Sequence, residues 1–175
     1  ILIFFCASFF LLIQTHAQDF NILDYGAKPN GHFLNTQAIQ AAIDTATQQK
    51  EGRVIIPKGN FLTGSIYLKS NVELHLEEGA FLLGSIDTDH YEKVGFWKAL
   101  VVADSQQNIM ITGPGAIDGQ GRELALRLDS LFYAGQVDSS EYNFVEKRPI
   151  YFTRPMLINL WECQNITVKH LKLKN

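Results

Sequence analysis

The chain has 175 residues, of which 46% are hydrophobic and 19% are charged, and its formal net charge is -3. The charges are spread along the chain and form no basic run, so we expect no nucleic-acid partner. Beyond the first residues, no segment is apolar enough to span a bilayer. The remaining length is sufficient for one domain with a buried core.

The first 17 residues form a separate apolar segment. Their apolar run ends in Thr15-His16-Ala17, which has the small-x-small pattern of a leader cleavage site. We therefore predict that residues 1–17 are a secretory signal peptide and that the protein is secreted to an extracellular or periplasmic space. An apolar anchor that stays attached is the alternative. The segment lacks an initiator Met and a basic n-region, so we expect its start to be missing.

One of the two cysteines lies in the predicted mature chain. Cys6 falls in the signal peptide, which leaves Cys163 without an intramolecular partner even in an oxidising compartment. We expect Cys163 to be a buried small apolar residue, because no neighbouring base or exposed setting marks it as a catalytic thiol.

A short strand, a turn and a helix come next in chain order. Residues 20–31, FNILDYGAKPNG, alternate briefly and then contain turn signals. From Thr36 to about Gln48, apolar residues recur at helical spacing, and Asn35 stands at the N-cap position. This pattern predicts an amphipathic helix that covers the end of a stacked core and blocks its strand edges.

Short strands separated by frequent turns follow, and their pattern repeats. Segments 52–56 and 61–68 are strand-like, and the unit at 70–85 recurs at 107–121 and 164–175. Each copy has an Asn, a β-branched residue and then alternation. Repetition of this unit predicts a parallel β-helix, in which each strand pairs with the strand one full coil away.

An asparagine opens each repeat at the same position. Asn71, Asn108 and Asn165 each precede a β-branched residue. Because Asn tolerates left-handed φ and can hydrogen-bond its own backbone, we predict that these residues form equivalent corners of successive coils. Asn165-Ile166-Thr167 also matches a glycosylation sequon, although the corner role explains it without a sugar.

The unit at 107–121, QNIMITGPGAIDGQG, shows the pattern of one coil most fully. Its alternation predicts that Ile109 and Ile111 point inward, and its glycines are expected to permit tight corners with positive φ. Asp118 is expected to bond backbone amides at a corner rather than to act as an acid.

Residues 122–154 interrupt the repeats. Residues 122–128 have the pattern of a short helical turn, and the rest is polar with scattered aromatic residues. We predict a loop that leaves the solenoid between two coils. Its aromatic and charged residues suit a sugar ligand, and a packed surface excursion is the alternative.

Five segments, taken in order, resemble the N-terminal part of glycoside hydrolase family 28, the polygalacturonases and their pectin-degrading relatives. They are FNILDYGAKPNG, AIQAAID, VIIPKGNFLTGSIYLKSNVELHLEEGAFLLGS, QNIMITGPGAIDGQG and RPMLINLWECQNITVKHLKLKN. The match runs from about Asp19 to Asn175. The opening segment also occurs in other β-helix proteins, so it is the occurrence of all five segments in this order that is specific to the family. The resemblance implies an all-β fold, a right-handed parallel β-helix. It also implies secretion and inverting hydrolysis of galacturonan or rhamnogalacturonan.

The catalytic motifs that the resemblance implies do not occur in this sequence. They are an Asn-Thr-Asp motif, an Asp-Asp pair, a Gly-His-Gly-type histidine and an Arg-x-Lys motif. Inverting hydrolysis needs one carboxylic acid to protonate the leaving oxygen and a carboxylate to activate water. We therefore assign no catalytic or metal-binding residue and leave the substrate-binding residues open. Residues 18–175 are expected to be an incomplete β-helix domain, inactive alone, with catalytic residues beyond Asn175.

The acidic residues and histidines that are present have structural interpretations. Asp87 and Asp89 with His90 form a conceivable acid/base group, but the segment has the composition of a polar turn. The same interpretation applies to the acidic residues before other turns, Asp24, Glu77 and Glu78. No metal is expected, because the remaining histidines lack a ligand-spaced partner: His32, His75 and His170.

Three classes of function remain open. The leading prediction is a secreted glycosidase that cleaves α-glycosidic bonds of pectin. We expect this protein to be a monomer whose partner is a pectic polysaccharide, with no cofactor and no membrane contact after leader cleavage. The alternatives are a calcium-dependent polysaccharide lyase and a non-catalytic carbohydrate-binding β-helix. The sequence does not distinguish endo from exo action.

Overall fold

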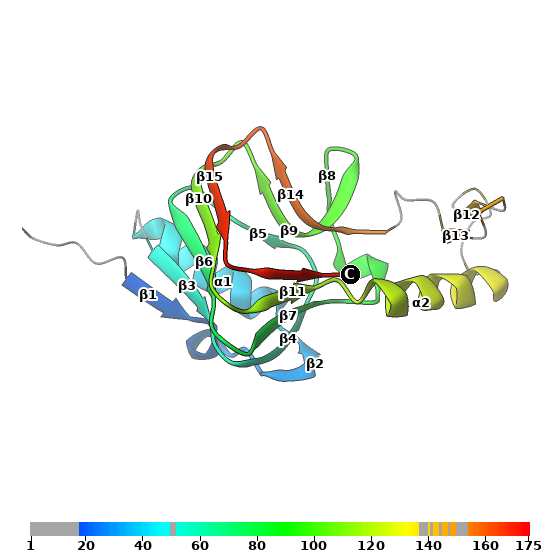
Figure 1. The fold of residues 1–175 in the computed structure, drawn as a ribbon, viewed down its shortest axis with the longest axis horizontal. Helices are drawn as coiled ribbons and strands as arrows, with labels where there is room; N and C mark the ends of the chain where they lie inside the picture. The colour runs from blue at the N-terminus through cyan, green and yellow to red at the C-terminus, as the bar shows by residue number, and fades with distance from the viewer. Residues whose placement is uncertain are drawn as a thin grey trace, which may run out of the picture.

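The computed structural model describes residues 18–49, 52–136, 140, 142–143, 145–146, 148–149 and 154–175. The predicted signal peptide, residues 1–17, lies outside them. Three parallel sheets stack in a β-helix-like arrangement, with two α-helices beside them (Figure 1). Within the described residues, no helix is both long and apolar enough to cross a membrane.

Each sheet gathers strands from successive coils. Sheet A contains β1 (Gln18–Asn21), β3 (Gly52–Ile56), β6 (Val72–Leu76), β10 (Gln107–Thr112) and β15 (Gln164–Lys169). Sheet B contains β2 (Asn30–Leu34), β4 (Gly59–Thr63), β7 (Ala80–Gly84), β11 (Ala116–Asp118) and β16 (Lys172–Lys174). Sheet C contains β5 (Ile66–Tyr67), β9 (Trp97–Asp104) and β14 (Met156–Trp161). The chain passes from sheet A to B to C and returns to A, which confirms the predicted parallel coil. Its right-handed sense stays a prediction.

The remaining short elements lie between these strands. They are η1 (Ile22–Tyr25), η2 (Thr88–His90), β8 (Lys93–Val94), β12 (Tyr142–Asn143) and β13 (Arg148–Pro149). The pairs β8 with β9 and β12 with β13 are antiparallel. They are therefore excursions from the coil rather than part of its stack.

The register places apolar residues of successive coils over one another. One inward ladder of sheet A contains Val54, Leu74, Ile111 and Val168. The first three of these side chains are fully buried. Burying one such aliphatic side chain contributes about 1.5–3 kcal/mol, so these ladders stabilise the stack.

The coil at 107–121 has the predicted inward side chains. Ile109 and Ile111 are fully buried, whereas Met110 is 39% exposed. Thr112 lies on the same outward side as Met110 but is buried. Its hydroxyl contacts Glu73 and His75, which account for its burial without placing it in the apolar core.

The glycines of this coil serve two different purposes. Gly113 has φ +104, as predicted for a corner. The same expectation was wrong for Gly115 and Gly119, which do not have positive φ. A Cβ at Gly115 would lie 2.7 Å from Leu76 Cβ, and one at Gly119 would lie 2.7 Å from Leu157 Cδ2. These two positions need glycine because neighbouring coils approach them closely.

The predicted first helix is present as α1 (Thr36–Gln48). Its apolar stripe is buried against the first coils, and the stripe consists of Ala38, Ile39, Ala42, Ile43 and Ala46. In chain order α1 lies between β2 of sheet B and β3 of sheet A, where later coils have a strand of sheet C. Its predicted role as a cap of the solenoid stays a prediction.

Asn35 occupies the predicted N-cap position of α1. Its side chain makes no capping hydrogen bond to α1. Instead, its Oδ1 accepts from Lys28 N at 2.6 Å, and its Nδ2 donates to Phe33 O at 2.7 Å and to Leu62 O at 3.2 Å. The residue is fully buried, so these bonds satisfy an amide that burial would otherwise penalise. Asn35 thereby joins the segment before α1 to β4.

The predicted corner asparagines form a ladder. Asn71, Asn108 and Asn165 have φ values of 64, 57 and 55. Asn108 Nδ2 donates to Asn71 Oδ1 at 2.7 Å, and Asn165 Nδ2 donates to Asn108 Oδ1 at 3.0 Å. The left-handed corners are confirmed, and the side chains bond to one another across coils. The Nδ2 atom of the Asn165 sequon is therefore engaged in the ladder.

The second helix corrects the predicted loop at 122–154. Helix α2 spans Gly121–Tyr133, which is far longer than the short helical turn expected at 122–128. Leu124 and Leu128 are buried on one face. This i, i+4 pair gives the helix an apolar contact with the rest of the molecule. Parts of the remaining segment lie outside the described residues.

We expect the asparagine ladder to contribute measurably to stability. Asn108→Gly keeps the left-handed backbone accessible but removes two hydrogen bonds, so the free energy of unfolding should fall by about 1–2 kcal/mol. Asn108→Ala should cost about 1 kcal/mol more, because Ala disfavours left-handed φ. Urea unfolding of the full-length protein measures both values.

Gln107→Ala is the matched control for this ladder prediction, since Gln107 is exposed and adjacent. This substitution should change the free energy of unfolding by less than about 0.5 kcal/mol. Equal stabilities for Asn108→Gly and Gln107→Ala would contradict a stabilising ladder.

Candidate functional site

A cavity of about 450 Å³ opens at the edge where the strands of sheet C begin. It is lined by the first residues of β9 and β14, the residues just before β14, the first turn of α2, and Asn175. These are Trp97, Gly121, Arg122, Leu124, Arg154, Pro155, Met156 and Asn175. The lining thus combines two guanidinium groups, an indole and an amide.

The two arginines of this cavity differ in their surroundings. Arg122 is 81% exposed, and its nearest ion pair joins Nη1 to Glu123 Oε1 at 3.8 Å. Arg154 Nε is buried and has no hydrogen-bond partner among the described residues. A buried donor without a partner is costly, so a ligand oxygen that reached this atom would satisfy it. Among the described residues that line the cavity, none is acidic.

Small residues allow the coils to meet beside the cavity. A Cβ at Gly119 would lie 3.0 Å from Asn175 Oδ1, and a Cβ at Gly121 would collide with the same atom. Pro155 fixes the backbone immediately before β14, where its missing N–H removes no ladder bond. The local sequence therefore holds the two sides of the cavity close together.

A hairpin containing β8 lies against the outward side of sheet C. Val94 packs with Ala99 and Val102 in a small apolar cluster. Asn159 Nδ2 donates to Val94 O at 3.3 Å, and Tyr67 Oη donates to Glu92 Oε2 at 2.8 Å. Burial, together with this hydrogen bond, raises the pKa of Tyr67 to about 12.

Two aromatic rings are exposed near this hairpin. Phe96 at the hairpin turn is 74% exposed, and Trp161 at the end of β14 is 41% exposed. A Cβ at Gly95 would lie 3.8 Å from the Trp161 ring, so the hairpin turn and Trp161 are neighbours. Exposed aromatic faces of this kind suit the apolar face of a sugar ring.

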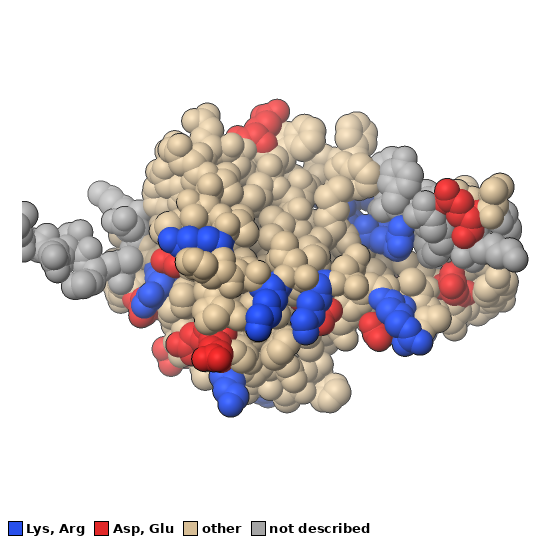
Figure 2. Space-filling view, viewed as in Figure 1, with Lys and Arg blue, Asp and Glu red and all other residues tan. Residues whose placement is uncertain are grey.

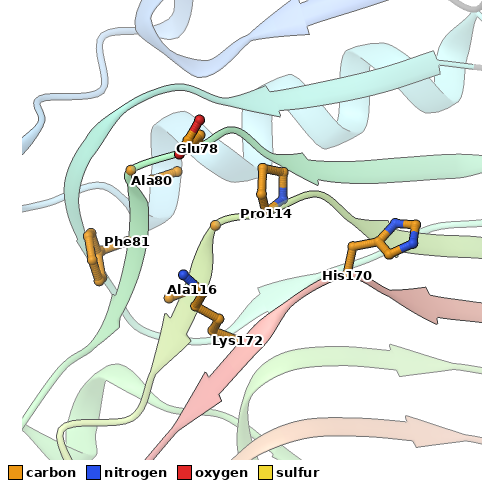
Figure 3. A pocket seen from close by; sticks show the side chains of 9 residues that line it. Glu78, Ala80, Phe81, Pro114, Ala116, His170 and Lys172 are labelled. Atoms are coloured by element: carbon orange, nitrogen blue, oxygen red, sulfur yellow. The ribbon is translucent and has the colours of Figure 1, made fainter.

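A second cavity, of about 330 Å³, follows the corner between sheets A and B. Small residues of two coils form its floor: Gly79, Ala80, Pro114, Gly115 and Ala116. Figure 3 shows Lys172 reaching across Ala116 in the direction of Phe81, with His170 on the same side and Glu78 opposite. We call this cavity the corner groove.

Lysines of β16 lie between the corner groove and the cavity at sheet C. Lys172 pairs with Ala116 and Lys174 pairs with Asp118, so both lysines lie on the outward face of sheet B. Lys174 Nζ lies 5.1 Å from the centre of the Phe81 ring. Figure 2 shows basic side chains gathered along β16 and the start of α2.

The acidic residues of the turn at 85–90 have the predicted structural setting. Asp87 accepts from Asp89 N at 3.0 Å as the N-cap of η2. His90 Nδ1 lies 2.7 Å from Ser85 Oγ, and both aspartates are exposed. These residues line neither cavity described above. Asp118 Oδ1 likewise accepts from Gln120 N at 2.9 Å, which confirms its predicted corner bond.

Two of the other residues considered from the sequence share a cavity. Glu78 and His170 both line the corner groove, a proximity that the sequence did not predict. No group of His, Cys, Asp and Glu suited to a metal ion occurs in the described part of the chain. Cys163 is half-buried, and its thiol donates to Trp161 O at 3.2 Å.

The cavity at sheet C was not predicted residue by residue. The sequence indicated a ligand-binding excursion at 122–154, and residues at its two ends, Arg122 and Arg154, do line this cavity. Tyr133, one of the aromatic residues expected there, lies at the far end of α2 and does not line it. No sequence pattern marked Trp97 as a residue of the cavity, because its place there depends on pairing between distant segments.

Comparison with known families supports the interpretation of the fold. A family described as "Rhamnogalacturonase A/epimerase, pectate lyase-like" matches residues 20–75. An exo-poly-alpha-D-galacturonosidase from Dickeya chrysanthemi is 38% identical over 58% of this chain and 19% of that enzyme. A probable polygalacturonase from Vitis vinifera is 29% identical over 93% of this chain and 33% of that protein. The chain therefore spans a third or less of these relatives.

Solved structures show the same arrangement of coils. The family 28 exopolygalacturonase of Yersinia enterocolitica matches with a TM-score of 0.72 at 28% sequence identity. The match covers 91% of this chain and 35% of that enzyme. The stacked parallel sheets are thus shared with a solved exopolygalacturonase.

The bond from Tyr67 to Glu92 should make stability depend on alkaline pH. The pKa of Tyr67 is raised from an ordinary value near 10 to about 12, so its stabilising contribution is present below about pH 10 and is lost as pH rises towards 12. Tyr67→Phe should lower the free energy of unfolding at pH 8 by about 1 kcal/mol. It should also flatten the decline between pH 10 and 12.

Urea unfolding at a series of pH values tests this expectation. Tyr91→Phe serves as a comparison, because burial alone raises the pKa of Tyr91, whose hydroxyl donates to Ser85 O. Parallel stability curves for the wild type and Tyr67→Phe across this range would contradict the assigned role of Tyr67.

Proposed function

Since the chain contains a pectate-lyase-like domain of the polygalacturonase, glycoside hydrolase family 28 type, we propose that the whole protein is a secreted glycosidase that hydrolyses α-linked galacturonan with inversion. The cavity at the edge of sheet C is the proposed point of contact with the polysaccharide. Secretion follows from the apolar leader pattern of residues 1–17.

The single observation that carries this proposal is the chemistry of that cavity. Galacturonate is a sugar ring with an ionised carboxylate, and the cavity offers Arg122, Arg154 and Trp97. A guanidinium binds a carboxylate through paired N–H donors, and an indole offers an apolar face to a sugar ring. The Nε of Arg154, which has no partner among the described residues, provides the donor that such a carboxylate would engage.

The catalytic carboxylates are proposed to lie C-terminal to Asn175. No acidic residue is found among the described residues that line the cavity. The chain covers only 19% and 33% of two relatives, so most of the length of such proteins lies outside the matched region. Inverting hydrolysis would need an acid and a base about 6.5–9.5 Å apart, with a water between the base and the anomeric carbon.

We further propose that the enzyme removes units from chain ends. The names of the Dickeya and Yersinia relatives include exo action. In this chain the β8 hairpin lies across the outward side of sheet C, where it would restrict passage of a polymer. Products of a single small size from the start of the reaction would support exo action, whereas a ladder of intermediate oligomers would contradict it.

The reaction class can be tested directly with the full-length protein. Hydrolysis predicts release of reducing ends from polygalacturonate, without unsaturated ultraviolet-absorbing products and without loss of rate on chelation of calcium. Calcium-dependent unsaturated products would favour a lyase instead. Binding without any cleavage would favour a non-catalytic carbohydrate-binding protein.

Arg154→Lys tests the proposed contact with the substrate. Lysine keeps the positive charge but loses the paired donors, so KM for polygalacturonate should rise about tenfold, equivalent to about 1.4 kcal/mol. Steady-state kinetics of the full-length enzyme measure this change.

Arg127→Lys is the matched control, because Arg127 is exposed on α2 and does not line the cavity. Its KM should equal that of the wild type. Equal KM values for all three proteins, with unchanged thermal midpoints, would contradict a role for Arg154 in substrate binding.

A further inference from the structure

Small residues recur along the corner groove in successive coils. Gly79 and Ala80 lie at the start of β7, and Gly115 and Ala116 lie at the start of β11. All four residues line the groove. The groove therefore extends over more than one coil, as a site for a linear polymer requires.

Two lysines lie at this hollow. Lys172 lines it together with His170, and Lys58 lies close enough that a Cβ at Gly79 would be 3.1 Å from its Cγ. Glu78 is the acidic residue among the described residues of the lining. Ionised lysines here would attract a polyanion.

The lysines continue from the groove along β16. Lys172 and Lys174 are two residues apart on the same outward face, a separation of about 6.6 Å along a strand. Asp118 is the strand partner of Lys174, but the Nζ of Lys174 lies over the Phe81 ring. The Asp118 carboxylate already accepts from Gln120 N. Among the described residues, neither Lys172 nor Lys174 forms an ion pair, so both ammonium groups are available to a ligand carboxylate.

We propose that the corner groove and the outward face of β16 form an accessory binding surface for carboxylated polysaccharide. The corner groove shares no lining residue with the cavity at sheet C, which adjoins the end of β16. Lys172 and Lys174 bind carboxylates of successive sugars, and Phe81 supports one ring or the stem of Lys174. Asn175 follows Lys174 directly and lines the sheet C cavity, so bound polymer is led towards it.

The assignment of the polymer as a uronan rests on the proposed function, whereas the surface itself rests on its charges and shape. A sulfated glycan would present similar charge. A carboxylated polymer is chosen over a sulfated one because galacturonan is the substrate in the proposed function. The surface contributes to retention of long chains and not to the chemical step.

Affinity electrophoresis of the full-length protein in gels containing polygalacturonate tests this proposal. Lys172→Glu combined with Lys174→Glu should weaken retention about tenfold, because two attractive contacts become repulsive. The same variant should raise KM for the polymer and leave the kinetics on the shortest cleaved oligomer unchanged. Fully methyl-esterified pectin, which keeps the rings but lacks the charges, should not retain the wild type.

Lys28→Glu is the control for Lys174→Glu as a single substitution. Lys28 Nζ also lies over a phenyl ring, at 4.5 Å from the centre of Phe33, so charge change and lost ring contact are matched. Lys28→Glu should retain wild-type binding. Lys174→Met keeps an apolar stem over Phe81 without the charge and should weaken retention, which separates charge from misfolding.

The outcomes separate this surface from the proposed function. The accessory surface would be overturned if the double variant were retained like the wild type or if Lys28→Glu lost as much retention as Lys174→Glu. It would also be overturned if the wild type bound esterified pectin as well as polygalacturonate, or bound a sulfated glycan of the same charge more tightly. A wild type that is retained through Lys172 and Lys174 but releases no reducing ends would leave this surface standing and contradict the glycosidase.

Discussion

In-register pairing between successive coils is the constraint on which the rest of the molecule depends. A solenoid has no central core that all elements share, and each coil is stabilised by its neighbours. Ile111 must therefore suit both Leu74 and Val168, its partners in the adjacent coils. A shift of one residue would move every inward side chain to the surface. The asparagine ladder opposes such a shift, because its amides bond only when equivalent corners lie over one another.

Outward positions of the same strands are not subject to this constraint, so their residues can differ from one coil to the next. In sheet B the residues at one outward position are Asn60, Phe81, Ala116 and Lys172 in successive coils. These differences between coils do not disturb the inward-facing residues of sheet B, among which Ile117 of β11 is fully buried. Charge and aromatic surface can therefore be arranged along the outside with little cost to stacking. The groove and the lysines of β16 are consequences of this freedom.

Local signals in the sequence predicted the elements that depend mainly on local interactions. The apolar residues of α1 recur at helical spacing in the sequence. The helix begins at Thr36 and ends at Gln48, as predicted. The corner asparagines were predictable because left-handed φ limits the choice of residue. The length of helix α2 was underestimated because Gln120 enters it at φ +50 after a glycine-rich coil, and its buried stripe is limited to Leu124 and Leu128.

Contacts between distant segments could not be predicted from local sequence patterns. Asn35 is of a residue type typical of an N-cap. Its side-chain amide nevertheless bonds to the carbonyl of Leu62 and to the backbone of Lys28 rather than to the first turn of α1. The cavity at sheet C joins Trp97 to Arg154 and Asn175, so its lining depends on how two coils pair. The proximity of these residues follows from the register of the strands and from the path of α2, neither of which a local pattern shows.

The same dependence couples ligand binding to the stability of the stack. Trp97 begins β9, and Arg154 precedes β14, the strand that pairs with β9 in the next coil, so a ligand that contacts both residues binds only when those coils are paired. A ligand that binds the folded state alone stabilises it by about 2.7 kcal/mol at a hundred times its Kd. This is comparable with burial of one aliphatic side chain of a ladder. A polyanion held at this edge therefore acts as a further contact between coils.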